Sequence, residues 1–304
     1  MAGEDESYIV GRVEWNDPIQ SRASCDCSFV AAMSSVAWTH PGVVAGSERK
    51  SRTEHGAVVR KFQFYNSKKD CWDYVDITKN IPLISPESSD RGETWPALLE
   101  KAYVKWRIET YDKKKTDKKK TDDKVDEEDY KRVFPTTCEQ ALDGLTPFQI
   151  DSNLMSELNE DSFFDLVKRN CLWVEPDRNS KGDWLVKVRN PIVAYTGPET
   201  KELSLDDFLE KGLIPSHAYS LLGYAWNDRM ILRDPMGRGS ETNKNRMLGW
   251  YDILGEADDK TNALNIKESD AVLSLSRWDM VSYFLSVVIA VDVDQPVTYS
   301  IDLR

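Results

Sequence analysis

The segment from Cys27 to Trp38 constrains the fold of this chain more than any other. Apolar residues fill most sides of it, namely Phe29, Val30, Ala31, Ala32, Met33, Val36 and Ala37. A helix that is apolar nearly all round is buried at the centre of a domain. Asp26 is a candidate N-cap, which would place Cys27 in the first turn, and His40-Pro41-Gly42 is expected to end the helix.

Two further patterns in the first half predict regular structure. Trp95, Leu98, Leu99, Ala102, Tyr103 and Trp106 recur at helical spacing, with Pro96 in the expected first turn and Thr94 as a candidate cap. Residues 61–65 and 71–77 alternate and are rich in aromatic side chains, with a polar stretch between them. That combination predicts a β-hairpin.

The second half is expected to be rich in strands. The candidates are residues 184–188, 217–224, 230–233, 271–275 and 283–293. Helices followed by strands are typical of an α+β protein, here with a helical first subdomain and a β-rich second one. We expect the cleft between the two to be the place where a ligand binds.

Composition indicates a folded protein and limits its main partners. With 304 residues, 40% hydrophobic residues and ten tryptophans, the chain can bury a large core. Its formal net charge of −12 disfavours nucleic acid or an anionic membrane as the main partner. The sequence leaves the oligomeric state open.

The segment from Asp112 to Arg132 differs in kind from the rest. It holds nine basic and eight acidic residues, and only Val125 and Tyr130 are apolar. Such a segment cannot bury a core, so we expect an exposed, mobile insertion. A basic binding patch is the weaker alternative, because the acids neutralise it within the same segment.

The cysteine pattern and the first residues bear on the compartment. Five cysteines form no regular framework, as expected for a reducing environment. Residues 1–6 are acidic and lack the features of a signal peptide, and no apolar run approaches the roughly 20 residues that cross a bilayer. We therefore expect a cytoplasmic protein without stable membrane insertion.

Cys27 is a candidate nucleophile and His217 a candidate base. The amides and dipole at a helix start favour a thiolate. Of the three histidines, His40 and His55 lie in expected surface loops, whereas His217 begins a strand that would hold its ring in place. The alternatives are a buried structural cysteine and a structural histidine.

Asp234 is the candidate for orienting His217. It follows the expected strand 230–233 and precedes Pro235. If that strand is the neighbour of the strand after His217, the carboxylate accepts a hydrogen bond from the imidazole. The alternative is an ordinary turn aspartate before proline.

Several motifs together resemble the calpain protease core, a papain-like cysteine peptidase of two subdomains. They are residues 25–32 (Cys-Asp-Cys-Ser-Phe-Val-Ala-Ala), residues 93–103 (Glu-Thr-Trp-Pro-Ala-Leu-Leu-Glu-Lys-Ala-Tyr) and residues 212–220 around His217. The resemblance covers roughly residues 13–293 and keeps the order of the family's motifs.

The resemblance implies roles for four residues. Cys27 is the nucleophile, His217 is the general base, and Gln20 helps to form the oxyanion hole beside the Cys27 amide. Asp234 stands where the family has an asparagine. Two other departures are Met236 and Ser28, which replace tryptophans of the family's motifs.

The resemblance also implies calcium. Asp17 and Glu93 match side chains of the family's first calcium site, and hard oxygen ligands suit that ion. One calcium ion there is the expected cofactor.

These observations predict a calpain-like intracellular cysteine endopeptidase acting on protein substrates through a Cys-His-Asp triad. The expected organisation is an N-terminal arm (1–14), a first subdomain with the nucleophile (15–140) and a second with His217 and Asp234 (141–304). Two alternatives stay open: a catalytically impaired domain that binds a protein partner, and a transglutaminase-like acyl transferase.

Overall fold

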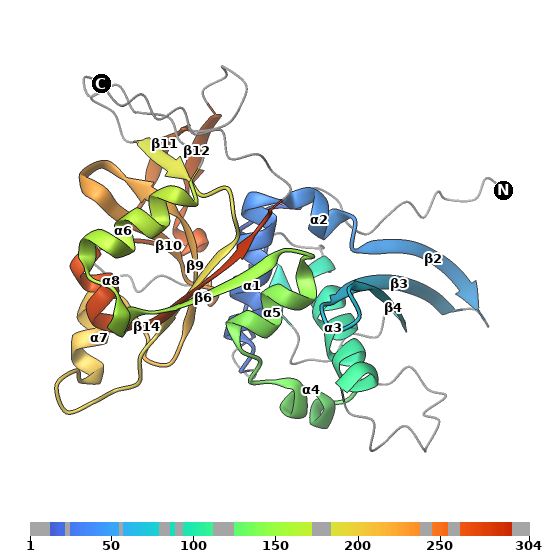
Figure 1. Cartoon of the computed structure of the whole chain (residues 1–304). Coiled ribbons are helices and arrows are strands. Elements are labelled where there is room, and N and C mark those ends of the chain that lie inside the picture. The colour runs from blue at the N-terminus through green and yellow to red at the C-terminus, as the bar shows by residue number, and fades with distance from the viewer. Residues whose placement is uncertain are drawn as a thin grey trace. The chain divides into compact units, whose positions relative to one another are not determined.

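The computed structural model describes residues 13–21, 25–54, 57–78, 86–88, 94–111, 125–171, 184–237, 245–254 and 262–293. It has a mixed α+β composition (Figure 1). The chain divides into two compact units. The first contains the described residues up to Pro147 together with Pro235–Gly237, and the second contains Phe148–Asp234 and the described residues after Gly237.

The first unit combines five helices with a small sheet and a two-stranded pair, counted over the described ranges. Its elements are β1 (Pro18–Ile19), α1 (Cys27–Thr39), α2 (Pro41–Ala45), β2 (Glu48–Glu54), β3 (Ala57–Asn66), β4 (Cys71–Thr78), β5 (Glu87–Ser88), α3 (Trp95–Tyr111), α4 (Glu127–Val133) and α5 (Cys138–Leu145). β1 pairs with β5, and β2, β3 and β4 form an antiparallel sheet in that order.

Helix α1 is the core of the first unit, as its composition predicts. Every residue from Ser28 to Trp38 is buried. The Phe29 ring stacks on Tyr103 of α3 at a centroid distance of 4.2 Å, and α1 also packs against α2 and α5. Burial of aromatic side chains of this size supplies much of the hydrophobic stabilisation.

The predicted hairpin and the predicted second helix are confirmed. β3 pairs with β4 from Val59 opposite Thr78 to Asn66 opposite Cys71. Asp73 of β4 accepts hydrogen bonds from Asn66 at 2.6 Å and from Trp106 of α3 at 3.3 Å. The second contact joins the hairpin to α3.

The prediction of an exposed, mobile insertion over residues 112–132 is contradicted at its C-terminal end, where the chain is helical. Residues 112–124 lie outside the described ranges, but Glu127–Val133 forms α4. A reciprocal capping box between Asp126 and Asp129 begins this helix, and Tyr130 is buried against Phe134. The buried ring of Tyr130 and the capping box stabilise this helix in spite of its charged composition.

The second unit is built on one large sheet. Its helices and strands are β6 (Gln149–Leu154), α6 (Glu160–Arg169), β7 (Trp184–Lys187), β8 (Ile192–Thr196), α7 (Leu205–Lys211), β9 (Ala218–Ala225), β10 (Arg229–Arg233), β11 (Gly249–Leu254), β12 (Asn262–Ile266), β13 (Val272–Leu275), α8 (Arg277–Tyr283) and β14 (Phe284–Val291). Across the described residues, the strand order is β12-β11-β7-β9-β8-β14-β6, and β10 joins β9 to β13. All five predicted strands are present.

Strand β9 organises this sheet. It pairs antiparallel with β10 along Ser220–Ala225, with β8 near its start and with β7 near its end. Gly223 is required where β7 passes, because a Cβ atom there would lie 2.0 Å from the Val186 carbonyl oxygen. The strand is therefore fixed on both edges.

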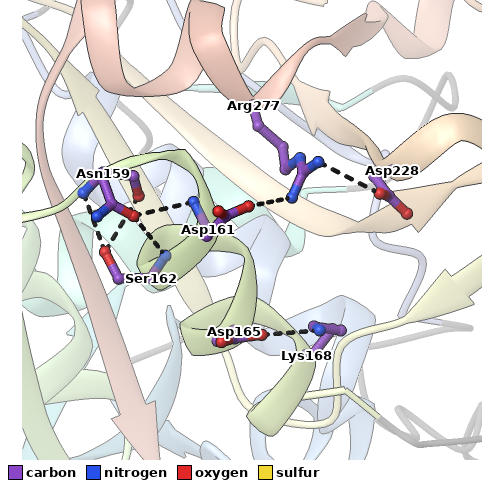
Figure 2. Close-up of polar contacts among 7 residues, drawn as sticks. All are labelled: Asn159, Asp161, Ser162, Asp165, Lys168, Asp228 and Arg277. Atoms are coloured by element: carbon purple, nitrogen blue, oxygen red, sulfur yellow. Dashed lines mark hydrogen bonds and ion pairs between the residues drawn. The ribbon is translucent and has the colours of Figure 1, made fainter.

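Helices α6 and α8 pack together in the second unit. Figure 2 shows Arg277, the first residue of α8, contacting Asp161 of α6 at 3.0 Å and Asp228 at 3.6 Å. The same figure shows the Asn159 side chain accepting hydrogen bonds from the Asp161 and Ser162 amides at the start of α6.

The boundary between the units differs from the expected one. The predicted boundary after residue 140 falls inside α5, and the first unit continues to Pro147. The physical reason is that α5 packs on α1. None of the helices in the described ranges combines the length and apolarity needed to cross a bilayer.

Candidate functional site

Cys27 is the first residue of α1, as predicted. Its thiol is free and its side chain is partly exposed, while the next residue begins the buried part of the helix. The backbone oxygen of Asp26 accepts hydrogen bonds from Phe29 at 2.8 Å and Val30 at 3.0 Å. Cys27 thus lies where the amides of a helix start favour negative charge.

Asp26 holds the N-cap position, but its side chain makes no capping hydrogen bond. The predicted position is confirmed, whereas the expected side-chain bond is absent. The carboxyl group is instead fully buried and lies against the carboxyl group of Glu100 in α3. A pair of carboxyl groups therefore lies in the interior of the first unit, and one of them belongs to the residue that precedes the nucleophile candidate in the sequence.

Ser28, which follows Cys27, is also buried. The Cys138 thiol of α5 lies 3.6 Å from its hydroxyl oxygen. Burial raises the pKa of Cys138 to about 12, despite the hydrogen bond with Ser28. Cys138 is therefore a protonated structural thiol.

His217 and Asp234 come together in the second unit. His217 directly precedes β9 and Asp234 directly follows β10, and these strands pair with Arg233 opposite Ser220. The His217 Nε2 atom lies 3.0 Å from Asp234 Oδ1. Both side chains are buried, at 7% and 8% exposure.

Further contacts fix the histidine and the aspartate. The His217 amide donates to the Thr196 hydroxyl at 2.9 Å, and that hydroxyl lies 3.0 Å from the His217 carbonyl oxygen. The imidazole meets the Tyr219 ring edge to face at 5.1 Å. The Asp234 amide donates to the Ala271 carbonyl at 3.0 Å. Such constraints suit an imidazole that must keep one orientation.

Gln20 lies directly after β1 in the first unit and is half-buried. Its amide donates to the Pro235 carbonyl oxygen at 2.7 Å. Pro235–Gly237 belongs to the first unit, so the chain leaves the second unit directly after Asp234. Met236, on this segment, is partly exposed.

The calcium candidates are described only in part. Asp17 is buried, and its Oδ2 atom accepts hydrogen bonds from the Glu14 amide at 2.8 Å and from Trp95 Nε1 at 3.1 Å. Glu93 lies outside the described residues. Within the described ranges, no group of three or more His, Cys, Asp or Glu side chains is arranged to hold a metal ion.

The structure thus places Cys27 and Gln20 in one unit and His217 with Asp234 in the other. Sequence reasoning missed two residues that support these groups, Glu100 and Thr196. Glu100 occupies an apolar face of the predicted helix 95–106, and a charged residue on such a face is a usable signal. Thr196 carries no comparable signal.

The chain was also compared with known proteins. No model of a known protein family matches it, and no curated protein matches it at a significant level.

Proposed function

We propose that this protein is a cysteine endopeptidase of the calpain-like, papain-fold type. The observation that carries the proposal is the buried contact between His217 and Asp234, at 3.0 Å, on two paired strands. An imidazole held by a carboxylate is suited to proton transfer. The free, partly exposed thiol of Cys27 at a helix start supplies the matching nucleophile.

In the proposed reaction, the Cys27 sulfur attacks the carbonyl carbon of a peptide bond. The oxygen becomes an oxyanion, stabilised by the Cys27 amide and the Gln20 side chain. His217, which has taken the proton of the Cys27 thiol, gives it to the amine nitrogen as the C–N bond breaks, and a thioester joins the acyl group to Cys27. His217 then takes a proton from water, whose oxygen attacks the thioester. The C–S bond breaks, the carboxylic acid product leaves, and His217 returns the proton to the Cys27 sulfur.

Asp234 has an orienting role in this reaction. It contacts Nε2 of the imidazole, so Nδ1 is the nitrogen that exchanges protons with the thiol and the leaving group. The carboxylate also stabilises the imidazolium ion formed when the thiol loses its proton. An asparagine would orient the ring without adding that charge.

Calcium dependence forms part of the proposal through Asp17 and Glu93. Asp17 and Glu93 would hold the ion, and these residues are near Gln20 and Trp95 in the sequence. This part is tested separately, by comparing activity in calcium with activity in a chelator.

The decisive experiment is labelling with a peptidyl epoxide, followed by mass spectrometry of the modified peptide. We expect labelling at Cys27 that is lost in C27S and strongly reduced in H217A. C71S is the matched control, because Cys71 is an exposed free thiol on β4, and it should label like the wild type. Running each sample with calcium and with chelator tests the metal requirement.

Two other outcomes would count against the proposal. A folded protein that stays unlabelled from pH 5 to 9, with or without calcium, would favour an impaired domain that binds a partner. Incorporation of a primary amine into a glutamine-containing substrate without peptide cleavage would favour acyl transfer.

A further inference from the structure

Two carboxyl groups meet in the interior of the first unit. Asp26 directly precedes Cys27, and Glu100 lies in the second turn of α3. Both residues have 0% exposure, and their carboxyl groups interact with each other in the interior. Burying two acids together is costly unless they share a proton.

The proton lies on Glu100. Ionised carboxylates only accept hydrogen bonds, so a bond between two carboxyl groups requires one of them to be protonated. Neither oxygen of Glu100 has an N–H or O–H donor among the described residues. Burial, and then the neighbouring Asp26 carboxylate, raise the pKa of Glu100 well above its usual value. In this pair Glu100 is therefore the carboxyl group that donates.

This bond changes what Asp26 does at the helix start. An aspartate in the N-cap position ordinarily accepts from the second or third amide of the helix, here those of Ser28 and Phe29. The Asp26 side chain makes no such bond. The Phe29 amide donates to the Asp26 backbone oxygen instead.

We propose that Glu100 is a positioning residue for Cys27. Its hydrogen bond holds the Asp26 carboxylate in the interior, away from the start of α1, so that the Cys27 and Ser28 amides and the local positive potential stay available to the thiolate and the oxyanion. The effect of Glu100 on catalysis rests on the proposed peptidase function. The pairing of Glu100 with Asp26 rests on the geometry of the first unit alone.

Charged groups on the neighbouring elements are engaged with other partners. On α3, the Lys101 ammonium donates to the Thr78 carbonyl at 2.8 Å. On β3, Arg60 pairs with Glu48, and on β4, Asp73 pairs with Lys69.

Three further acids lie on elements packed against α1 or α3. Asp17, beside β1, accepts from Trp95, Asp129 of α4 pairs with Arg132, and the Cys138 thiol of α5 contacts Ser28. Asp26 remains the charged partner that acts on Glu100.

The first test is thermal unfolding as a function of pH, and it needs no enzymatic activity. Because the pKa of Glu100 is raised in the folded state, its stabilising contribution is complete below about pH 4.5 and is lost as pH rises toward the folded pKa. E100Q keeps a donor for Asp26 without a titrating group. The Tm of E100Q minus that of the wild type should therefore increase steadily from pH 4.5 to 8.

E109Q is the matched control, because Glu109 is an exposed acid on the same helix. Its Tm difference from the wild type should stay flat over the same range. An E100Q difference as flat as that of E109Q would overturn the shared proton.

The second test separates positioning from folding. E100A removes the donor and lets the Asp26 carboxylate turn to the amides of α1. We expect kcat to fall by about 10- to 100-fold with little change in KM, and iodoacetamide to alkylate Cys27 several-fold more slowly at pH 7. E100Q should restore both rates to within about three-fold of the wild type.

The outcomes separate the two proposals. Equal kcat and equal alkylation in E100A and the wild type would overturn the positioning role. A wild type without peptidase activity would overturn the proposed function, while alkylation and Tm still test Glu100. If E100A does not fold, comparing E100Q in the wild-type and D26N backgrounds replaces it. The pH-dependent Tm gain should shrink in D26N, and an unchanged gain would overturn the pairing.

Discussion

His217 and Asp234 lie 3.0 Å apart because each is attached to the end of a strand, and the two strands are neighbours in one sheet. Seventeen positions separate them in the sequence, but the antiparallel pairing of β9 with β10 places them at the same end of the two strands. The relationship depends on backbone pairing within the second unit. It is therefore rigid in a way that a contact between two loops is not.

Removing the Asp234 side chain should impair catalysis more than removing its charge. We expect D234A to lower kcat by on the order of 10²- to 10⁴-fold, because the imidazole loses its orienting partner. D234N should lose less, because the amide oxygen can still accept from Nε2. D228N is the control, since Asp228 is an aspartate of the same unit that pairs with Arg277 of α8 (Figure 2). Equal turnover by D234A and the wild type would remove Asp234 from the mechanism.

Apart from Cys27, the cysteines should react in two groups in the folded protein. Cys25 and Cys71 are exposed and should be alkylated by iodoacetamide within minutes at pH 8. Cys138 and Cys171 are buried, and burial raises the pKa of both thiols. They should react only after unfolding, which mass spectrometry with and without denaturant measures. Rapid labelling of Cys138 would contradict its buried position on α5, in contact with Ser28 of α1.

Gly237 is expected to be intolerant of a side chain. Its φ of +63° belongs to the left-handed region, and an added Cβ would lie 2.9 Å from Ile19 of β1. G237A should lower the free energy of unfolding by about 2 kcal/mol, from backbone strain and crowding together. The matched control is G42A, because Gly42 has nothing within 4 Å of such an atom. Denaturant unfolding of the two variants side by side gives the comparison.

Asp279 should make stability depend on acidic pH. Burial opposes its ionisation, but hydrogen bonds from Ser276 and from Lys211, at 2.9 Å, outweigh it and hold the pKa of Asp279 below its usual value. The stabilisation is present above about pH 4 and is lost as pH falls through the folded pKa.

D279N should therefore cost about 1 kcal/mol at pH 7, where it weakens the cap of α8, and much less at pH 3. D165N serves for comparison, since Asp165 is an exposed partner of Lys168 (Figure 2) and should have little effect at either pH. A D279N penalty independent of pH would contradict the depressed pKa.

The long, strongly patterned elements could be predicted from the sequence. α1, α3, the β3–β4 hairpin and the buried strands of the second unit carry enough apolar residues to fix their type. The contact between His217 and Asp234 also followed from simple reasoning about adjacent strands.

Other features had no comparable local signal. Helices α6, α7 and α8 have only 7 to 10 residues each, and their capping side chains are common in loops too. Helix α4 depends on one buried ring, that of Tyr130, within a charged stretch. The pairing of Asp26 with Glu100 depends on tertiary packing of α1 on α3, which no spacing within either segment specifies.

Because Pro235–Gly237 belongs to the first unit, cutting the chain once between Pro147 and Phe148 does not give two complete units. A fragment ending at Pro147 would lack the carbonyl that receives the Gln20 amide and the glycine that packs on Ile19. A fragment beginning at Phe148 would carry that segment without its binding surface. Domain dissection and split-protein strategies should therefore keep the chain whole, or supply residues 235–237 to the first unit by circular permutation.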